Sequence, residues 1–443
     1  MDRSIDLREE IERLPLGRQH VLIIAMLALA TLFDGYDVFV PAYVIPYAMQ
    51  AWRLLPSQAG LLVSAGLVGF MIGALANGAL ADRIGRKPVL VGSLLFAAAG
   101  NLATAAWANT YAEFLASRLL TGLGLGMILP VSVALINEVA PRRSANILLG
   151  WAMTGWSIGG VVAALTGFAL APSHGWRSLF AVGALAAPLA VLAAFVLPES
   201  PRYLAIRGRQ GAVRAAVGRL ASSEAGRYAQ TEFTIAEDTG HRGSYLRLLT
   251  PDVRAGTFVV WICSGLSLFS IFGLSSWTPQ LMLQRGSAIG ASFALSALLQ
   301  FAALVGGIGC GWTADRAGRD RTLRVTWILG AVAVAGLAVL GGQAADIVFL
   351  SMAGYCVMGA QTVLNNRTAA LYDTEIRSTG VGAQLGVGRI GGILGPYVGG
   401  WIQQLFPGSA ALFVCVACAV GGCALCIRLL DGGPAPVRAS APE

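Results

Sequence analysis

The sequence predicts an all-α membrane protein, with twelve transmembrane helices in two pseudo-symmetric six-helix bundles. Its composition, a series of long apolar runs and an internal repeat together support this prediction. Of the 443 residues, 56% are hydrophobic and only 12% are charged. A soluble protein carries roughly a quarter of its residues as charged groups. The mean hydropathy of +0.68 therefore indicates a chain that faces lipid over much of its surface.

The apolar runs are each long enough to cross a bilayer, which needs about 20 residues of helix. They are separated by one long polar segment, which divides them six and six. We therefore expect an N-terminal bundle over 1–197, a cytoplasmic linker with short surface helices over 198–253, and a C-terminal bundle over 254–443. The twelve predicted spans are 20–48, 57–80, 88–107, 111–133, 146–170, 177–197, 254–281, 290–313, 323–341, 346–369, 380–404 and 409–429.

Lys and Arg favour cytoplasmic loops, and their distribution predicts the orientation. With both termini in the cytoplasm, only Arg53, Arg177 and Arg285 of the 31 basic residues fall in outer segments. Arg118 and Arg389 fall inside helices. The net charge of +8 is thus a feature of topology, and we expect a lipid bilayer as partner and no nucleic acid. The predicted location is the bacterial inner (cytoplasmic) membrane.

A ten-residue pattern occurs twice, as GALADRIGRK at 78–87 and as GWTADRAGRD at 311–320. Arg142 and Arg377 correspond in nearly the same register. The shared spacing indicates two homologous halves, and such repeats place a substrate site near the bilayer midplane between them.

The charges of these loops can latch helix ends through ion pairs and helix-dipole contacts. We therefore expect them to control gating and to carry no information about the substrate. The predicted gating residues are Gly78, Asp82, Arg83, Gly85, Arg86, Glu138, Arg142, Asp315, Arg316, Arg319 and Arg377.

Charged side chains inside membrane helices are costly unless paired, so they are functional candidates. Asp34 and Asp37 are three residues apart and share one helix face, and Arg118 is expected at a similar depth to Asp34. Two carboxylates beside one arginine cannot both be neutralised without a proton. Asp34, Asp37 and Arg118 are therefore the predicted proton-coupling residues. The alternative is a fixed ion pair that locks two helices together.

Arg389 is predicted nearer the middle of the membrane, close to Gln361 and Asn365, where it would meet a substrate anion. Aromatic rings on the inner helices could stack on a flat substrate. The helix at 254–281 has no Asn or Gln before Gln280, which argues against a sugar site. Asn77 and Asn101 are interpreted as residues that form hydrogen bonds between packed helices. The predicted substrate-binding residues are Arg389, Gln361, Asn365, Tyr36, Trp156, Phe269, Phe272 and Tyr355.

These motifs carry a family resemblance. The loop pair at 78–87 and 311–320 resembles the signature of the major facilitator superfamily. The pattern RxxxGxGxG at 118–126 resembles its helix 4 motif, and PESPR at 198–202 resembles a motif after helix 6 in sugar porters and their relatives. The resemblance covers essentially the whole chain.

The segment DGYD at 34–37 is similar to the helix 1 signature of the aromatic acid:proton symporters. That resemblance implies import of hydroxybenzoate, protocatechuate or benzoate by alternating access. It also implies a proton gradient as driving force. No cofactor is expected, and we expect a monomer. One departure is that this family usually carries Trp where this chain has Ala383 or Gln384, which suggests a smaller or more polar substrate.

Other functions fit the same residues less well. Bacterial nicotinate transporters, and the related synaptic vesicle glycoproteins, share GRIGG at 388–392 and remain the alternative, with nicotinate as a heteroaromatic carboxylate substrate. A sugar porter, a proton-driven efflux pump and a receptor that binds without transport fit less well. His20, His174 and His241 lack metal-ligand spacing, so neither an enzyme nor a metal site is expected. The glycines at 122–126 follow no strand and are interpreted as packing residues.

Overall fold

The computed structural model describes residues 4–221, 228, 230–234, 245–373 and 376–430. Its described residues are almost entirely helical, with two three-residue strands that the sequence pattern does not predict. They form two compact units, one of residues 1–44 and 65–239 and the other of residues 45–64 and 240–443. The domain boundaries expected from the sequence remain a prediction.

The first unit contains most of the elements up to residue 239, and α2 and α3 each have one end in the second unit. The elements are β1 (Ser4–Asp6), α1 (Leu7–Arg13), α2 (Arg18–Trp52), α3 (Pro56–Ile84), α4 (Arg86–Trp107), α5 (Tyr111–Val139), α6 (Ala145–His174), α7 (Arg177–Gly183), α8 (Ala186–Val196), α9 (Pro201–Ile206), α10 (Gln210–Ala221) and β2 (Glu232–Thr234). A short turn separates α7 from α8 inside the predicted span 177–197.

The second unit contains the remaining helices. These are η2 (Tyr245–Leu249), α11 (Arg254–Gln284), α12 (Ile289–Ala317), α13 (Arg319–Val339), α14 (Gln343–Ala353), the π-helical segment η3 (Gly354–Met358), α15 (Gly359–Leu371), α16 (Arg377–Leu405), α17 (Ser409–Cys426) and η4 (Ile427–Leu430).

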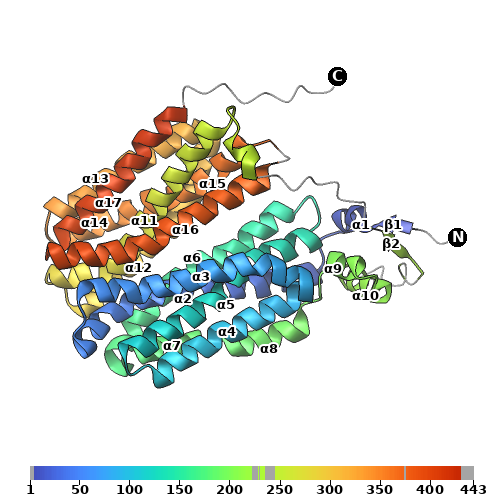
Figure 1. Cartoon of the computed structure of the whole chain (residues 1–443), viewed down its shortest axis with the longest axis horizontal. Helices are drawn as coiled ribbons and strands as arrows, with labels where there is room; N and C mark the ends of the chain where they lie inside the picture. The colour runs from blue at the N-terminus through green and yellow to red at the C-terminus, as the bar shows by residue number, and fades with distance from the viewer. Residues whose placement is uncertain (1–3, 222–227, 229, 235–244, 374–375, 431–443) are drawn as a thin grey trace. The chain divides into compact units, whose positions relative to one another are not determined.

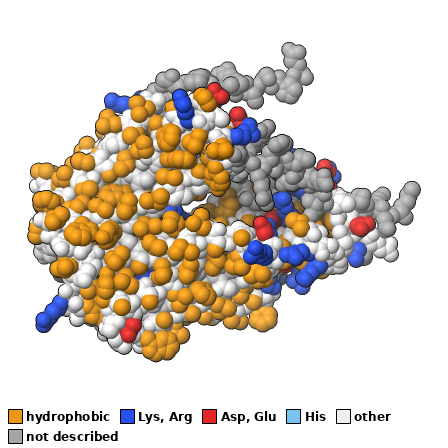
Figure 2. Space-filling model, viewed as in Figure 1, with side chains coloured by type: hydrophobic (Ala, Val, Ile, Leu, Met, Phe, Trp, Pro, Cys, Tyr) orange, Lys and Arg blue, Asp and Glu red, His pale blue; other side chains and the backbone are white. Residues whose placement is uncertain are grey.

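Eleven helices in the described part of the chain are long and apolar enough to cross a membrane. The predicted span 380–404 is the helix α16, which is 29 residues long but is not among the eleven. It carries Arg377, Gln384 and Arg389 among many glycines, so its mean hydropathy is lower. Figure 2 shows hydrophobic side chains over most of one face, with charged side chains gathered toward the end that carries α9 and α10. Large apolar side chains are exposed within the membrane-length helices, for example Phe195, which is 81% exposed. A surface of this kind suits lipid and not water.

Glycines let the membrane helices approach closely. A β-carbon at Gly122 or Gly126 of α5 would lie 2.1 Å or 2.0 Å from a backbone oxygen of α3, and one at Gly124 would lie 2.6 Å from a backbone nitrogen of α4. Small residues at such positions are how membrane helices pack without a hydrophobic driving force. The interpretation of the glycines at 122–126 as packing residues is confirmed.

The described elements β1, α1, α9, α10 and β2 lie together at one end of the first unit (Figure 1). There β1 pairs in parallel with β2, Ser4 opposite Glu232. Tyr228 donates a 2.6 Å hydrogen bond to Glu10 of α1. The short surface helices expected in the linker are present as α9, α10 and η2, with a strand added to them.

Candidate functional site

A buried polar cluster joins α2, α4 and α5 in the first unit. Asn101 Nδ2 donates to Asp37 Oδ2 at 2.7 Å, and Arg118 Nη1 donates to Asn101 Oδ1 at 3.3 Å. Arg118 Nη2 also donates to the backbone carbonyl of Asp37 at 3.0 Å. The Asn101 amide therefore connects the carboxylate to the guanidinium. Only this orientation of the amide serves both neighbours, because one needs a donor and the other an acceptor.

This cluster is shielded from water. Asp37 and Asn101 are 0% exposed and Arg118 is 2% exposed. The guanidinium lies over the ring of Phe180, 5.3 Å from its centroid, a cation–π contact that helps to compensate for lost hydration. The neighbouring Gly183 leaves room for the cluster, since a β-carbon there would lie 2.8 Å from Asp37 Oδ1.

Asp37 Oδ1 has no hydrogen-bond partner among the residues that the structure describes. Within that part of the chain, the guanidinium of Arg118 bonds to the carbonyl of Asp37 and not to its carboxylate. This arrangement differs from a simple ion pair, and it leaves one carboxylate oxygen available for a proton.

The other predicted residues of α2 lie close by. Asp34 is 0% exposed. Tyr36 is buried, and its hydroxyl donates to the Leu179 carbonyl at 2.8 Å. Next to it, Gly35 packs against the backbone of Trp156 in α6, where an added β-carbon would lie 2.0 Å from the carbonyl oxygen. The Tyr36 hydroxyl thus bonds within the first unit, and its role toward a substrate stays a prediction.

A second polar cluster consists of amides in the second unit. Gln361 and Gln384 each donate from Nε2 to Asn365 Oδ1, at 3.1 Å and 3.2 Å. Gln384 also donates to Ser264 Oγ of α11 at 2.9 Å. Gln384 is completely buried, whereas Gln361 and Asn365 are partly exposed. The structure brings the predicted pair Gln361 and Asn365 together, and it adds Gln384 and Ser264.

The remaining predicted substrate residues are distributed over four helical segments. Arg389 of α16 is partly exposed, as are Phe269 of α11 and Tyr355 of the π-helical segment, while Phe272 is 3% exposed. The π-helical segment that contains Tyr355 interrupts an α-helix, and such interruptions often mark functional sites. In the first unit, Trp156 is partly exposed and packs edge-on against Phe39, with ring centroids 5.2 Å apart.

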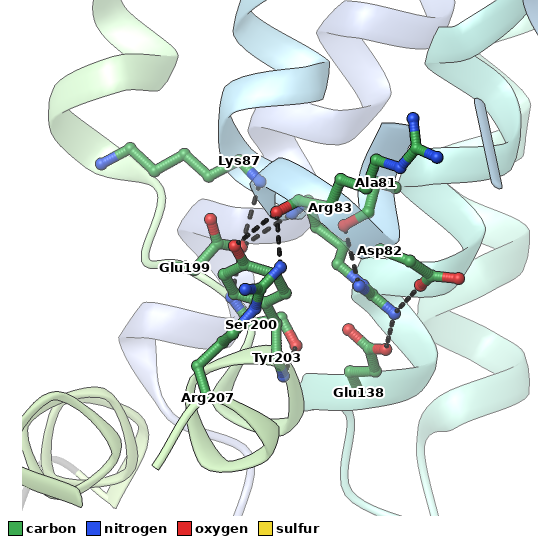
Figure 3. Close-up of polar contacts among 10 residues, drawn as sticks. Ala81, Asp82, Arg83, Lys87, Glu138, Glu199, Ser200, Tyr203 and Arg207 are labelled. Carbon is green, nitrogen blue, oxygen red and sulfur yellow. Dashed lines mark hydrogen bonds and ion pairs between the residues drawn. The ribbon is translucent and has the colours of Figure 1, made fainter. Parts of the chain in front are cut away.

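The first repeat loop forms an ion-pair network (Figure 3). Arg86 of α4 pairs with Asp82 of α3 at 3.2 Å and with Glu138 of α5 at 3.1 Å. The side chains of Arg86 and Glu138 are 11% and 10% exposed, and that of Asp82 is 73% exposed. Three helix ends are thus joined by one guanidinium. The contacts suit the predicted gating role, which stays a prediction.

Glu199 completes this network, although the sequence predicts no individual role for it. Its Oε1 accepts hydrogen bonds from the backbone N–H groups of Arg86 and Lys87 at 2.9 Å and 3.2 Å, at the start of α4 (Figure 3). These N–H groups have no partner within their own helix. Gly85 has a φ of 105° and would place a β-carbon 2.2 Å from Glu199 Oε2. The PESPR motif therefore supplies the cap of α4.

The same region fixes Arg83 through its backbone. Tyr203 and Arg207, both C-terminal to the PESPR motif, donate side-chain hydrogen bonds to the Arg83 carbonyl at 3.1 Å and 2.8 Å. The Arg83 side chain itself is exposed. A β-carbon on Gly78 would meet nothing within 4 Å, so its requirement for glycine has no explanation in this structure.

The second repeat loop is arranged differently. Asp315, Arg316 and Arg319 are all exposed, and the Arg316 guanidinium lies 3.8 Å from the ring centroid of Trp312. The described ion pair of this loop joins Asp320 to Arg367 of α15 at 2.6 Å. Asp320 occupies the repeat position of Lys87, so the charge at that position is reversed between the halves.

Arg142 and Arg377, which correspond in the repeat, are both exposed. The backbone N–H of Arg142 donates to the backbone carbonyl of Glu12 in α1. Arg377 donates from Nε to the Tyr372 carbonyl at 3.4 Å. Their gating role stays a prediction. Within the described residues, no group of three His, Cys, Asp or Glu side chains is placed to hold a metal ion.

The chain matches the Major Facilitator Superfamily over residues 27–396. It is 35% identical to the gallate transporter of Pseudomonas putida, covering 99% of this chain and 98% of that protein. It is 32% identical to the 4-hydroxybenzoate transporter PcaK of the same species (91% and 90% covered) and to the niacin transporter NiaP of Acinetobacter baylyi (89% and 90% covered).

The fold agrees with these matches. The inward-open structure of the xylose transporter XylE from E. coli superimposes with a TM-score of 0.74 at 18% identity, covering 95% of this chain and 98% of that one. Eleven of the described helices are long enough to cross a membrane, and the related proteins are transporters. The chain is therefore a polytopic membrane transporter and not an enzyme. The chain belongs to the major facilitator superfamily. The predicted fold class and the resemblance to the aromatic acid transporters are confirmed.

Proposed function

We propose that the chain is a proton symporter that imports a small aromatic carboxylate by alternating access. The observation that carries this proposal is the buried cluster of Asp37, Asn101 and Arg118, in which Asp37 Oδ1 has no hydrogen-bond donor among the described residues. Charged groups inside a membrane helix are costly, and they are retained where an ion or proton pathway needs them.

Proton coupling follows from the charge of this cluster. Asp37 is fully buried and, within the described residues, its carboxylate contacts Arg118 only through Asn101, so a proton on this carboxylate would remove a buried charge that no direct ion pair compensates. A proton on Asp37 Oδ1 would leave the bond from Asn101 to Oδ2 in place. The site can therefore gain and lose a proton without losing its connection to Arg118.

The substrate class is supported by the relatives, which include transporters of gallate and of 4-hydroxybenzoate. Arg389 of the second unit is the cation that we assign to the substrate carboxylate, because a planar guanidinium binds a carboxylate through two parallel hydrogen bonds. We place the protein in the bacterial inner membrane with both termini in the cytoplasm. Transport would be driven by the proton gradient.

Nicotinate is the second candidate substrate. It is supported by the niacin transporter NiaP of Acinetobacter baylyi, which is 32% identical to this chain over 401 residues. Nicotinate is also a flat ring with one carboxylate, so the same cation would meet it.

The test is uptake into proteoliposomes that contain the purified full-length protein. We expect an inward proton gradient to drive accumulation of radiolabelled 4-hydroxybenzoate above equilibrium, and an uncoupler to abolish it. Asp37→Asn should abolish accumulation but retain exchange of labelled for unlabelled substrate, since exchange needs no net proton movement. Accumulation by Asp37→Asn and Asp34→Asn at the wild-type level would refute proton coupling at these residues. Uptake of glucose but of no aromatic acid would refute the substrate class.

A further inference from the structure

We propose that Gln361 and Asn365 bind a ring hydroxyl of the substrate, and that Gln384 positions them. This inference rests on the proposed function and narrows it, because it assigns the substrate to the hydroxylated benzoates. It draws on the hydrogen-bond pattern of the amide cluster between α11, α15 and α16.

The donors of this cluster converge on one atom. The Nε2 groups of Gln361 and Gln384 both bond to Asn365 Oδ1, at 3.1 Å and 3.2 Å. An amide oxygen has two lone pairs, so this oxygen has no acceptor capacity left. The NH₂ group of Asn365 is not used in these bonds.

The acceptors, by contrast, are unsatisfied. Gln361 Oε1 and Gln384 Oε1 are buried atoms with no donor among the described residues. A buried acceptor without a donor is unfavourable, and native proteins rarely keep two together. Gln361 and Asn365 are partly exposed while Gln384 is fully buried, so the first two lie at the outer edge of the cluster, and a rotation of the Gln361 side chain would present its buried Oε1 to a ligand.

A phenolic hydroxyl matches this edge because it both donates and accepts. It can donate to Gln361 Oε1 and accept from the Asn365 NH₂ group. Benzoate has no group to offer, and the ring nitrogen of nicotinate only accepts, so each would leave Gln361 Oε1 unsatisfied. A carboxylate would bring another acceptor to an acceptor. The edge therefore favours hydroxylated rings.

Gln384 is a positioning residue in this arrangement. Its Nε2 bonds to Ser264 Oγ at 2.9 Å and thereby joins Asn365 to α11. Gly388 of α16 lets that helix approach α11 closely, because a β-carbon at Gly388 would lie 2.3 Å from Ser264 Oγ.

The test is equilibrium binding of 4-hydroxybenzoate, benzoate and nicotinate to the purified full-length protein in nanodiscs, measured by calorimetry. The wild type should bind 4-hydroxybenzoate about tenfold more tightly than benzoate, the value of one good hydrogen bond. Gln361→Leu should lose about that factor for 4-hydroxybenzoate and keep its affinity for benzoate. Gln384→Leu should lower the same ratio. The matched control is Gln403→Leu, a buried glutamine of the same helix that bonds to the Gly408 carbonyl, and it should leave the ratio unchanged.

Benzoate binding shows that each variant is folded, so a lost ratio cannot be a folding defect. An unchanged ratio in Gln361→Leu, or equal wild-type affinity for benzoate and 4-hydroxybenzoate, would overturn the hydroxyl site and leave the proposed function standing. Tighter wild-type binding of nicotinate than of 4-hydroxybenzoate would also overturn it. If the wild type bound none of the three acids, the proposed function itself would fail, and this inference with it.

Discussion

Glu199 caps the helix that begins at Arg86, although 113 residues separate the two in the chain. Its carboxylate oxygen accepts the backbone N–H of Arg86 at 2.9 Å, while the Arg86 side chain pairs with Asp82 and Glu138. The loop motif and the PESPR motif, which look independent in the sequence, thus form one structure. Negative charge at a helix N-terminus is favourable in itself.

Removing this cap should destabilise the protein. We expect Glu199→Ala to cost about 1 kcal/mol of stability, as for other helix caps, and Glu199→Gln to cost less because an amide oxygen can still accept. The measurement is thermal unfolding in detergent. Glu9→Gln is the control, because Glu9 is 67% exposed and its described ion pair is with Arg13 of its own helix. A melting temperature of Glu199→Ala equal to that of Glu9→Gln would contradict the cap.

The two repeat loops should respond unequally to the same substitution. Arg86→Ala removes the partner of Glu138, whose side chain is 10% exposed, and breaking a pair this close to full burial should cost about 3 kcal/mol, the lower end of the range for buried pairs. Arg319 occupies the corresponding position but is exposed, and Arg319→Ala should change stability by no more than about 0.5 kcal/mol. Unfolding of the two variants under identical conditions compares them directly. Equal losses would mean that the described asymmetry is absent in solution.

Hydropathy and repeats predicted the fold well because both are properties of the sequence alone. Each predicted span has a helix in the structure, although α16 is less apolar than the rest and the last span of the first half is divided into α7 and α8. The strands β1 and β2 were not predicted. They are three residues each and pair across more than 200 positions, so no local pattern announces them.

The site was predicted in part. Asp37 and Arg118 were recognisable as charges in apolar helices, and the structure joins them through Asn101. Asn101 was interpreted as a packing residue, because a single buried amide has the same sequence signal whether its partners are backbone or charged groups. Gln384 and Glu199 are similar cases, since their partners come from distant elements. Spacing along one helix cannot reveal such contacts.

Asn101 should be needed for coupling. Asn101→Ala removes both the donor to Asp37 and the acceptor for Arg118, so we expect loss of proton-driven accumulation by at least about tenfold, the effect of 1.4 kcal/mol. Asn77→Ala is the control, because Asn77 is also buried, at 6% exposure, but lies outside the cluster. Vesicle uptake and exchange are measured for both. If Asn101→Ala retained full accumulation, the amide would be a packing residue as first interpreted.

Arg389 should distinguish an acid from its amide. We expect Arg389→Ala to weaken binding of 4-hydroxybenzoate far more than binding of 4-hydroxybenzamide, because only the acid loses a charged hydrogen bond. Arg389→Lys should restore binding in part, since a point charge replaces a planar fork. Calorimetry measures the affinity of each of the two variants for each of the two ligands. Equal losses for acid and amide would assign Arg389 a structural role.

Gly183 offers the most specific test of the buried cluster, because the cluster leaves no room beside it. A β-carbon there would lie 2.8 Å from Asp37 Oδ1 and 2.6 Å from Asn101 Nδ2. These are contacts with the two groups that form the central hydrogen bond, and both are fully buried. Gly183→Ala should therefore displace the Asn101 amide or the Asp37 carboxylate and impair proton-driven uptake.

The matched control is Gly92→Ala in α4, where a β-carbon would meet nothing within 4 Å. Alanine favours a helix over glycine by about 1 kcal/mol, so Gly92→Ala should keep its transport and unfold at the same or a higher temperature. The same uptake assay, run with and without a proton gradient, is applied to both. We expect Gly183→Ala to lose gradient-driven accumulation by more than its exchange rate. If both alanine variants transported like the wild type, Asp37 and Asn101 would have to tolerate displacement, and their hydrogen bond could not be what couples the proton to Arg118.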